Sequence, residues 1–479
     1  MLGIVLTGSA QNEFDALRYS MTQFGGTARN VAMAGSFGSL GADFSTLSTN
    51  PAGIGLYRKS EISFTPSFYT GSVRSDYLGS GSDDIQYNFN MGNAGFVMAY
   101  PGKSKGSAFK YFQFGFGVNR TNNFNTRQLV EGFGSPVSIT QSYANLADGI
   151  PYTEFEQEQN AWAFDLSPAW YTYMFDTIPG SDQQYYSAVP QGSGIDQVYT
   201  ADTWGSMNEM VLSFGTNVSD RLYIGATMGI PYIRYFEETR YREIDSDNSI
   251  DGFDELSRIS RLTTKGSGVN FKLGMIVRAT NWFRFGGAIH SPTWYNNMHD
   301  TWSSDYYSWF DNGDAYNRST PVGNYDYNLQ TPWKALGNVS FIFFRMLAVS
   351  AEYEYLDYST ARLRAPGYDF FEENRAVKSE FRPTHNGRIG LEFKPGMVYF
   401  RGGAAYYMSP YASEPRDSER FYLTGGLGIR DKHFYADFAF SHGWSDWTYY
   451  LFSSPDVVPE PVKNTTITNQ LLLTIGFRY

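Results

Sequence analysis

The stretch MVLSFGTNVSDRLYIGATMGIPYIRYF, residues 210–236, decides the fold. It contains two segments in which apolar residues alternate with polar or small ones, separated by Asn217 to Asp220. Such alternation is typical of β-strands that bury one face. Asn, Ser and Asp favour a tight turn, because their side chains hydrogen-bond to the nearby backbone. The stretch therefore predicts a β-hairpin whose arms, at roughly 9 residues or more, are long enough to cross a bilayer at a tilt.

The same alternation recurs in pairs from residue 60 onward and predicts fourteen strands. They are expected at 60–72, 85–101, 108–122, 207–218, 221–240, 266–280, 282–295, 326–343, 346–360, 382–394, 397–409, 419–431, 433–451 and 464–479. Short connections alternate with long polar ones, of which the longest covers about 123–206. Bacterial outer-membrane barrels combine short periplasmic turns with long extracellular loops in this way. We therefore expect an all-β, antiparallel transmembrane barrel over 59–479, with both chain ends on the periplasmic side.

Composition supports a barrel of the Gram-negative outer membrane. Aromatic residues make up 18% of the chain, yet no run of about 18 to 20 apolar residues occurs that would form a spanning helix. There is no cysteine, which excludes disulfides and a lipidated N-terminal cysteine. The net charge of -11 and the lack of a basic run argue against a nucleic-acid partner. The last strand, TTITNQLLLTIGFRY, alternates to a terminal aromatic at Tyr479, which is the usual ending of such barrels.

The region before the barrel differs in kind. Residues 1–10 are similar to the remnant of an export signal, with Gly8 and Ala10 spaced like a signal-peptidase site. Residues 11–58 are rich in small side chains, which permit close backbone packing but no independent core. Such a segment needs walls around it, and we expect 11–58 to form a plug inside the barrel.

This region resembles the N-terminal hatch of the FadL/TodX family of outer-membrane transporters of hydrophobic compounds. The matching residues are Gly25, Gly26, Arg29, Met33, Ala34, Gly35, Asp43, Asn50, Pro51, Ala52, Gly53 and Leu56. Further similar segments follow in order along the barrel, at 290–293, 331–341, 352–359, 388–393, 401–411 and 425–440. The resemblance implies a fourteen-stranded barrel with an internal plug. It also implies that extracellular loops capture a hydrophobic ligand, which then leaves sideways into the bilayer through a gap in the wall.

The long loop carries the candidate ligand-binding residues. It contains a cluster of aromatic side chains that includes Trp162, Phe164, Trp170 and Tyr173. Such a cluster on a long loop forms either a binding surface or the loop's own small core. We slightly favour the core, because a loop of this length must bury apolar surface to be ordered.

Two glycine- and proline-containing motifs have both a structural and a functional interpretation. Asn50, Pro51 and Ala52 form either the turn that leads the plug into the first strand, which we favour, or a ligand contact. Gly115 and Gly117 mark either a kink that opens the wall or a crowded barrel interior.

An acidic surface loop is the remaining candidate site. Asp245, Asp247 and Asp251 lie in the run DSDNSIDGFDE, which begins like a calcium-binding EF-hand loop. Ile250 and Leu256 then occupy the positions of the required glycine and glutamate, so a solvated acidic loop is the better interpretation. No catalytic constellation is recognisable, and we expect neither an enzyme nor a cofactor.

The sequence therefore favours an outer-membrane channel for passive uptake of small hydrophobic compounds, such as fatty acid-like molecules. Its expected partners are membrane lipid and the hydrophobic ligand. The main alternative is a barrel of the same kind that does not transport and serves as a subunit of an outer-membrane secretion or assembly complex, with other outer-membrane or periplasmic proteins as partners. A surface receptor for haem or another ligand is a third hypothesis.

Overall fold

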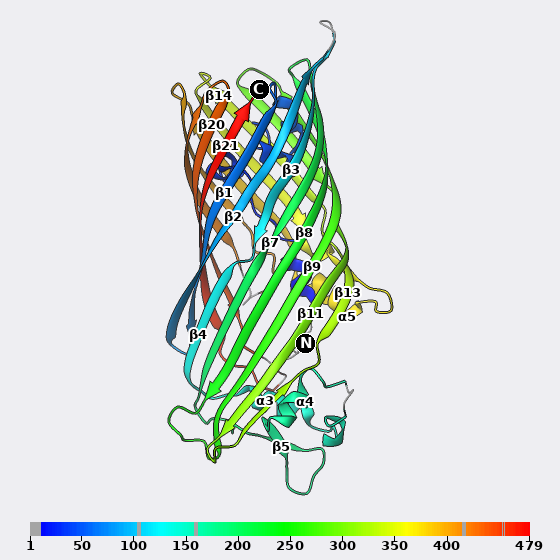
Figure 1. Ribbon diagram of the computed structural model, residues 1–479, viewed down its shortest axis with the longest axis vertical. Coiled ribbons are helices and arrows are strands. Elements are labelled where there is room, and N and C mark those ends of the chain that lie inside the picture. The colour runs from blue at the N-terminus through cyan, green and yellow to red at the C-terminus, as the bar shows by residue number, and fades with distance from the viewer. Residues whose placement is uncertain (1–10, 103–106, 158–160, 414–417, 453, 455) are drawn as a thin grey trace.

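The computed structural model describes residues 11–102, 107–157, 161–413, 418–452, 454 and 456–479 (Figure 1). The predicted remnant of an export signal, 1–10, lies outside the described residues.

Fourteen antiparallel crossings form a closed β-barrel, as the sequence predicts (Figure 1). Each crossing pairs with the next, and the last strand pairs with the first, so that the main sheet closes on itself. Three crossings consist of two strands each, because short segments at 124–125, 291–293 and 331–333 interrupt them. The crossings are β1 (Glu61–Tyr77), β2 (Ser80–Pro101), β3 (Phe109–Asn123) with β4 (Thr126–Ser135), β7 (Ile195–Val218), β8 (Leu222–Ile244), β9 (Phe253–Arg278), β10 (Phe283–His290) with β11 (Trp294–Phe310), β13 (Gly323–Gln330) with β14 (Lys334–Phe343), β15 (Leu347–Asp357), β17 (Pro383–Phe393), β18 (Val398–Tyr407), β19 (Arg420–Arg430), β20 (Phe434–Tyr449) and β21 (Val462–Arg478).

The barrel has a polar interior and an apolar exterior, the reverse of a soluble protein. In β17, Asn386 and Arg388 face inward and are buried, whereas Ile389, Leu391 and Phe393 face outward and are exposed. The same pattern recurs around the barrel and produces an outer surface of Phe, Leu and Ile side chains. Such a surface is stable in contact with lipid. Among the described residues, no helix combines the length and the apolar character needed to cross a membrane.

Short turns close one end of the barrel, at the top of Figure 1, and long loops extend from the other. The turn between β7 and β8 has Ser219 and Asp220 at positive φ, and the Asn217 side chain accepts a hydrogen bond from the Asp220 N–H at 2.9 Å. These are the local bonds that the sequence predicts for this turn. The short-turn end is accordingly the periplasmic end. Tyr479 lies there, whereas Gln11, the first described residue, hydrogen-bonds to Asp300 of β11 in the half that carries the long loops.

The strands run further at the long-loop end than the sequence predicts. β7, β8 and β9 have 24, 23 and 26 residues, and β4 (Thr126–Ser135) continues the third crossing beyond Asn123. The irregular part of the predicted loop 123–206 is therefore 136–194. It contains α3 (Ile139–Ala147), η3 (Tyr152–Glu154), α4 (Leu166–Tyr171), β5 (Phe175–Thr177) and β6 (Tyr185–Ser187). The other loops contribute β12 (Ala315–Ser319), η4 (Tyr358–Thr360), β16 (Arg362–Arg364) and α5 (Phe371–Glu380).

The N-terminal segment, residues 11–58, runs through the barrel as four short helical turns, drawn in dark blue in Figure 1. These are α1 (Glu13–Arg18), α2 (Ala28–Ala32), η1 (Phe44–Ser48) and η2 (Pro51–Leu56). Side chains cap them: Asn12 and Asp15 form a capping box at α1, and Thr27 caps α2. Helices this short are not stable alone. They are ordered by contact with the wall, where α2 packs against β18 to β21 and η2 against β3, β7, β8 and β9.

Candidate functional site: an interrupted wall and an internal chamber

The barrel wall is interrupted between β2 and the third crossing. β2 pairs with β1 from Ser80 to Val97, but with β3 only from Asn93 to Pro101. No β-ladder of the described residues joins Ser80–Gly92 of β2 to the third crossing. The outer side chains beside this interruption include the exposed Tyr87, Phe89 and Met91. Half of one strand edge is therefore unpaired at a point where the neighbouring surface is apolar.

The interruption arises because the third crossing bends inward at Phe124 and Asn125. The Asn123 side chain accepts hydrogen bonds from the N–H and the side-chain amide of Asn125, at 3.0 and 2.6 Å. Side-chain bonds of this kind compete with ladder formation. Phe124 is buried and packs edge-on against Tyr19 and Tyr235. Burial of this ring and local capping together hold the bend.

Beyond the bend, β4 packs against both β1 and β2 but forms no ladder with β2 among the described residues; the contact with β2 includes a side-chain hydrogen bond from Ser82 to the Leu129 carbonyl oxygen at 2.7 Å. Gln128 donates hydrogen bonds to Ser75 of β1 and Asn464 of β21, at 3.3 and 2.7 Å. A Cβ on Gly71 of β1 would lie 2.7 Å from the carbonyl oxygen of Asn125, so the close approach of the two backbones requires glycine there. β4 remains paired with β7. The wall is thus opened on one side of β4 and intact on the other.

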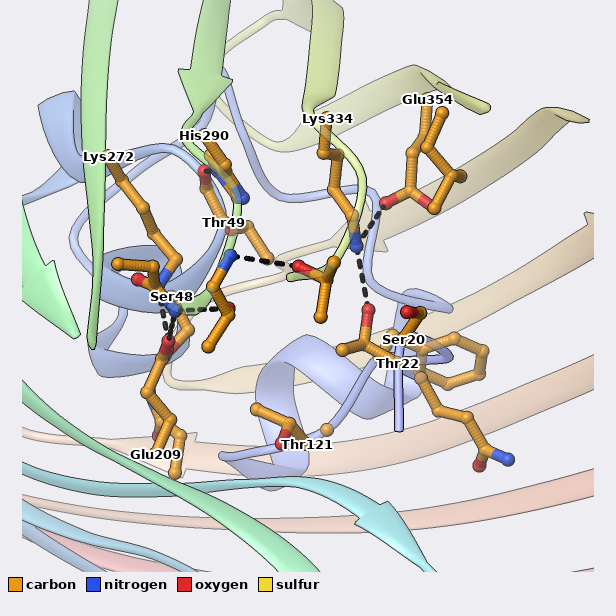
Figure 2. A pocket seen from close by; sticks show the side chains of 18 of the residues that line it. Ser20, Thr22, Ser48, Thr49, Thr121, Glu209, Lys272, His290, Lys334 and Glu354 are labelled. Carbon is orange, nitrogen blue, oxygen red and sulfur yellow. Dashed lines mark hydrogen bonds and ion pairs between the residues drawn. The ribbon is translucent and has the colours of Figure 1, made fainter. Parts of the chain in front are cut away.

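A chamber of about 110 Å³ lies inside the barrel between the N-terminal segment and the wall. Figure 2 shows Lys272 with Glu209 on one side of His290, and Lys334 with Glu354 on the other. Lys272 and Glu209 form a buried ion pair, each about 5% exposed. Lys334 Nζ lies 3.5 Å from Glu354, whose other ion-pair partner is Arg388 at 2.7 Å. The lining is therefore partly polar, and its cations, Arg120, Lys272, Lys334 and Arg388, outnumber its carboxylates, Glu209 and Glu354.

His290 and Tyr19 contribute an imidazole and a phenol to the chamber lining. His290 Nε2 donates to the carbonyl oxygen of Thr49 at 2.6 Å, which places the ring proton on that nitrogen. Burial raises the pKa of the Tyr19 phenol well above its ordinary value, and nearby Asp15 raises it further. At neutral pH the phenol stays protonated and adds no charge to the chamber.

The N-terminal segment is hydrogen-bonded to the third crossing beside the interruption. Gln23 N–H donates to the carbonyl oxygen of Thr121 at 2.8 Å, and the Asn122 side chain donates to Met21 at 3.1 Å. Thr121 and Asn122 directly precede the Asn123 cap. Residues 22–25 also line the chamber, so a movement of this short stretch would change both the chamber and the contact at the bend.

The structure places Asn50, Pro51 and Ala52 at the start of η2, directly against the wall. Asn50 accepts the Ala52 N–H at 3.2 Å and donates to the carbonyl oxygen of Gly38 and to Asn338 Oδ1, at 2.9 and 3.0 Å. Pro51 is the first residue of the helical turn. The motif thus caps the turn, and it also fixes the N-terminal segment to the barrel.

Gly115 and Gly117 lie in an uninterrupted part of β3. They oppose Val97 and Gly95 of β2 in regular register, and the bend lies at Phe124 instead. A Cβ on Gly115 would meet Leu47 at 2.7 Å, and one on Gly117 would crowd Phe44 at 2.7 Å. These glycines therefore make room for η1. The strand has no kink at either position.

The aromatic residues of the long loop do not form one surface. Trp170 packs against Phe155, Phe175 and Tyr185, and Tyr152 stacks on it at 5.6 Å. Phe155, Phe175 and Tyr185 belong to the buried core of the loop, and Trp162 is partly buried against it.

Two other candidates project from that core. Phe164 contacts Trp302 of β11 at 5.7 Å. Tyr173 is 46% exposed and contacts Tyr316 at 4.6 Å. Tyr173 is the candidate most accessible to a ligand.

The acidic loop does not assemble a metal site in the described part of the chain. No group of three or more His, Asp or Glu side chains is arranged there to hold an ion. Asp245 instead accepts the N–H groups of Ser249 and Ile250, at 3.1 and 2.7 Å. Its carboxylate is therefore used to close the turn.

The bend and the charged chamber are the features that the sequence prediction missed. The run Asn122, Asn123, Phe124, Asn125 is a local signal for a broken strand, since asparagine is unfavourable within strands. The charged chamber residues of the strands were detectable as charges at lumen-facing positions. Glu354 in β15 and Arg388 in β17 follow that pattern. Which of them pair with one another depends on contacts between distant strands.

The fold and the lumen together define a transmembrane β-barrel of the outer membrane whose interior is occupied by its own N-terminal segment. Several solved structures are similar to the chain over nearly its whole length. A FadL homologue from Pseudomonas aeruginosa is 13% identical, covers 95% of this chain and 98% of its own, and has a TM-score of 0.55. The toluene transporter TodX from P. putida is 11% identical, with coverage of 95% and 99% and a TM-score of 0.55. The toluene transporter TbuX from Ralstonia pickettii is 14% identical, with coverage of 95% and 99% and a TM-score of 0.51.

These likenesses show that the chain has the FadL/TodX fold, as its sequence resemblance implies. No protein-family model and no curated protein sequence matches the chain.

Proposed function

We propose that this protein is a passive outer-membrane channel, without enzymatic activity, for small hydrophobic compounds that leave sideways through the interruption between β2 and β4. The observation that supports the proposal is the half-strand Ser80–Gly92, which is paired on one side alone. In lipid an unpaired strand edge is costly unless another group or a passing ligand covers it. The similar structures are named as transporters of toluene, which agrees with a hydrophobic cargo.

The proposed route runs from the long loops through the chamber to the interruption. With about 110 Å³ the chamber is smaller than the roughly 150 Å³ cavity that accommodates benzene in an engineered protein. Passage therefore requires residues 21–25 of the N-terminal segment to move. The charged lining favours a molecule with a polar end, such as a fatty acid, over a pure hydrocarbon, because that polar end can replace the hydrogen bonds that break when residues 21–25 move.

A cysteine pair across the interruption tests the route. The native chain has no cysteine, and Ser82 Oγ of β2 lies 2.7 Å from the carbonyl oxygen of Leu129 in β4. Ser82→Cys with Leu129→Cys, joined by a short bis-methanethiosulfonate linker, would tie the two edges together. The matched control is Ser72→Cys with Ile85→Cys, two positions already opposed in the β1–β2 ladder.

The measurement is uptake of a labelled fatty acid, and separately of labelled toluene, by Gram-negative cells that lack another such channel. We expect the linker to reduce uptake about tenfold in the Ser82/Leu129 variant and to leave uptake by the control variant unchanged. Thiol reduction, which cleaves the linker, should restore uptake. Undiminished uptake in the linked variant would refute lateral exit. Absence of uptake by the native protein would refute the channel itself and favour a structural or assembly role.

A further inference from the structure

A second internal space lies at the periplasmic end, on the far side of the N-terminal segment from the chamber. This basic pocket has a volume of about 280 Å³ and is lined by Arg29, Arg284, Arg345, Lys394 and Glu392 around an apolar floor. Leu40 and Ile342 contribute to that floor. The pocket lies beside two short turns, one at 344–346 and the other following Lys394. Its ligand would therefore come from the periplasm or from the inner leaflet.

The single carboxylate of the basic pocket is already neutralised. Glu392 accepts two hydrogen bonds from Arg29, at 2.9 and 2.8 Å, and one from Arg401 at 2.7 Å. Arg401 in turn pairs with Asp437, which also binds Arg430. Within this network, three guanidinium groups oppose two carboxylates. The charges of Arg284, Arg345 and Lys394 are additional, so the pocket carries a strong positive excess in a protein whose net charge is -11.

Arg284 has unused hydrogen-bonding capacity. One of its terminal nitrogens donates to the carbonyl oxygen of Leu40 at 3.1 Å. Its Nε is buried, and no acceptor for it exists among the described residues. A buried guanidinium nitrogen without an acceptor is costly, and an anion in the pocket would satisfy it.

The cations reach the pocket from separate parts of the barrel. Arg284 lies in β10, Arg345 in the turn between β14 and β15, and Lys394 directly after β17. Arg345 and Lys394 are exposed, and the Lys394 ammonium lies 5.2 Å from the ring centre of Tyr399. Donors that converge from several directions suit a tetrahedral anion with several oxygens better than a planar carboxylate, and arginine is well adapted to phosphate.

We propose that the basic pocket binds a phosphate-bearing anion at the periplasmic end of the barrel. Two sources share this chemistry: free phosphate in the periplasm, and the headgroup of an inner-leaflet phospholipid. Basic pockets of membrane proteins commonly bind lipid headgroups, and the apolar floor of Leu40 and Ile342 would accommodate the start of an acyl chain. The pocket touches Arg29, Leu40 and Leu56 of the N-terminal segment, so an occupied pocket would also stabilise that segment.

Titration calorimetry on the full-length, delipidated protein in nonionic detergent tests this proposal. The probes are inorganic phosphate and, separately, dihexanoyl-phosphatidylglycerol. The variants are Arg284→Gln and Arg345→Gln; the second lies in an exposed turn and does not affect the core. Arg221→Gln is the matched control, because Arg221 is an exposed arginine in another periplasmic turn that does not line the pocket. Thermal unfolding of each variant verifies that the barrel is folded.

Loss of one guanidinium contact should weaken binding about tenfold in each of the two pocket variants and not in the control. Saturable binding of inorganic phosphate with this pattern supports the proposal with the free anion as ligand. Binding of the lipid alone with the same pattern supports it with the headgroup as ligand. Absence of binding by both probes, or equal affinity in the native protein and both pocket variants, would overturn the proposal. None of these outcomes bears on lateral exit at the opposite half of the barrel.

Discussion

Replacing Gly225 of β8 by alanine should detach η2 from the barrel wall. Gly225 faces inward beneath Pro51 and Ala52, and a Cβ there would lie 2.7 Å from the Ala52 nitrogen and closer still to the Pro51 carbonyl. Both obstacles are backbone atoms, so no side-chain rotation relieves the clash. η2 must retreat by about 1 Å to regain ordinary contact. Overpacking of this kind costs about 1–3 kcal/mol. Weakened bonds from Asn50 to Gly38 and Asn338 add about 1 kcal/mol each.

Hydrogen–deuterium exchange of residues 44–56 measures this detachment. A loss of about 3–5 kcal/mol in local stability accelerates exchange by roughly 150- to 5000-fold where amides open locally. Gly337→Ala is the matched control, since it also replaces a strand glycine but its Cβ would meet no atom of the described residues within 4 Å. The barrel strands should exchange as in the native protein in both variants. If residues 44–56 exchange equally in Gly225→Ala and Gly337→Ala, close glycine packing does not hold the N-terminal segment.

Three further predictions concern the chamber, the interruption and the long loop. Lys272→Met leaves the buried Glu209 without its ion-pair partner and should lower the free energy of unfolding by about 3–5 kcal/mol. The double variant Lys272→Met/Glu209→Gln should recover much of that loss. Thermal unfolding in detergent measures both variants, and an unchanged stability of the single variant would contradict the pairing. Amides of β2 within 80–92 that point away from β1 should exchange at least about tenfold faster than those of 93–101, and uniform protection along β2 would mean that the wall is closed. Burial raises the pKa of Asp165, so the long loop should lose stability as the pH rises from near 3.8 through that raised pKa. Limited proteolysis should show this loss of stability. The variant Asp165→Asn should abolish the pH dependence.

The sequence predicted those parts of the fold that depend on local alternation. Each crossing has to present apolar side chains to lipid at every second residue, so the pattern is legible within one strand, as in the segment around Ile389 and Leu391. Turns such as Asn217 to Asp220 were predictable because their hydrogen bonds lie within four residues. These two local signals suffice for the count of fourteen and for the direction of the barrel.

The candidate site could not be predicted in the same way, because its contacts are long-range. Gln128 turns inward to reach Asn464, which is 336 residues away, and Lys272 pairs with Glu209 across 63 residues. The sequence shows that such residues are polar within strands but not which partners they meet. Gly115 illustrates the limit, since a glycine in a strand is equally consistent with a bend and with the close packing against Leu47 that the structure contains.

The distribution of contacts along the N-terminal segment identifies the part that can open the route. From Gly26 to Gly55 nearly every residue is buried, and the segment is fixed by the Arg29–Glu392 ion pair and by wall glycines such as Gly225. Residues 21–25 are instead half-buried throughout, and within them Thr22 and Gln23 are held by hydrogen bonds, from Lys334 to Thr22 at 2.7 Å and from Gln23 to Thr121 at 2.8 Å. Phe24 is fixed by packing against Tyr407 and Tyr422. A ligand with a polar end can exchange hydrogen bonds for its own, whereas it cannot compensate for lost packing. Opening is therefore cheapest at Thr22 and Gln23, which line the chamber beside the end of β3.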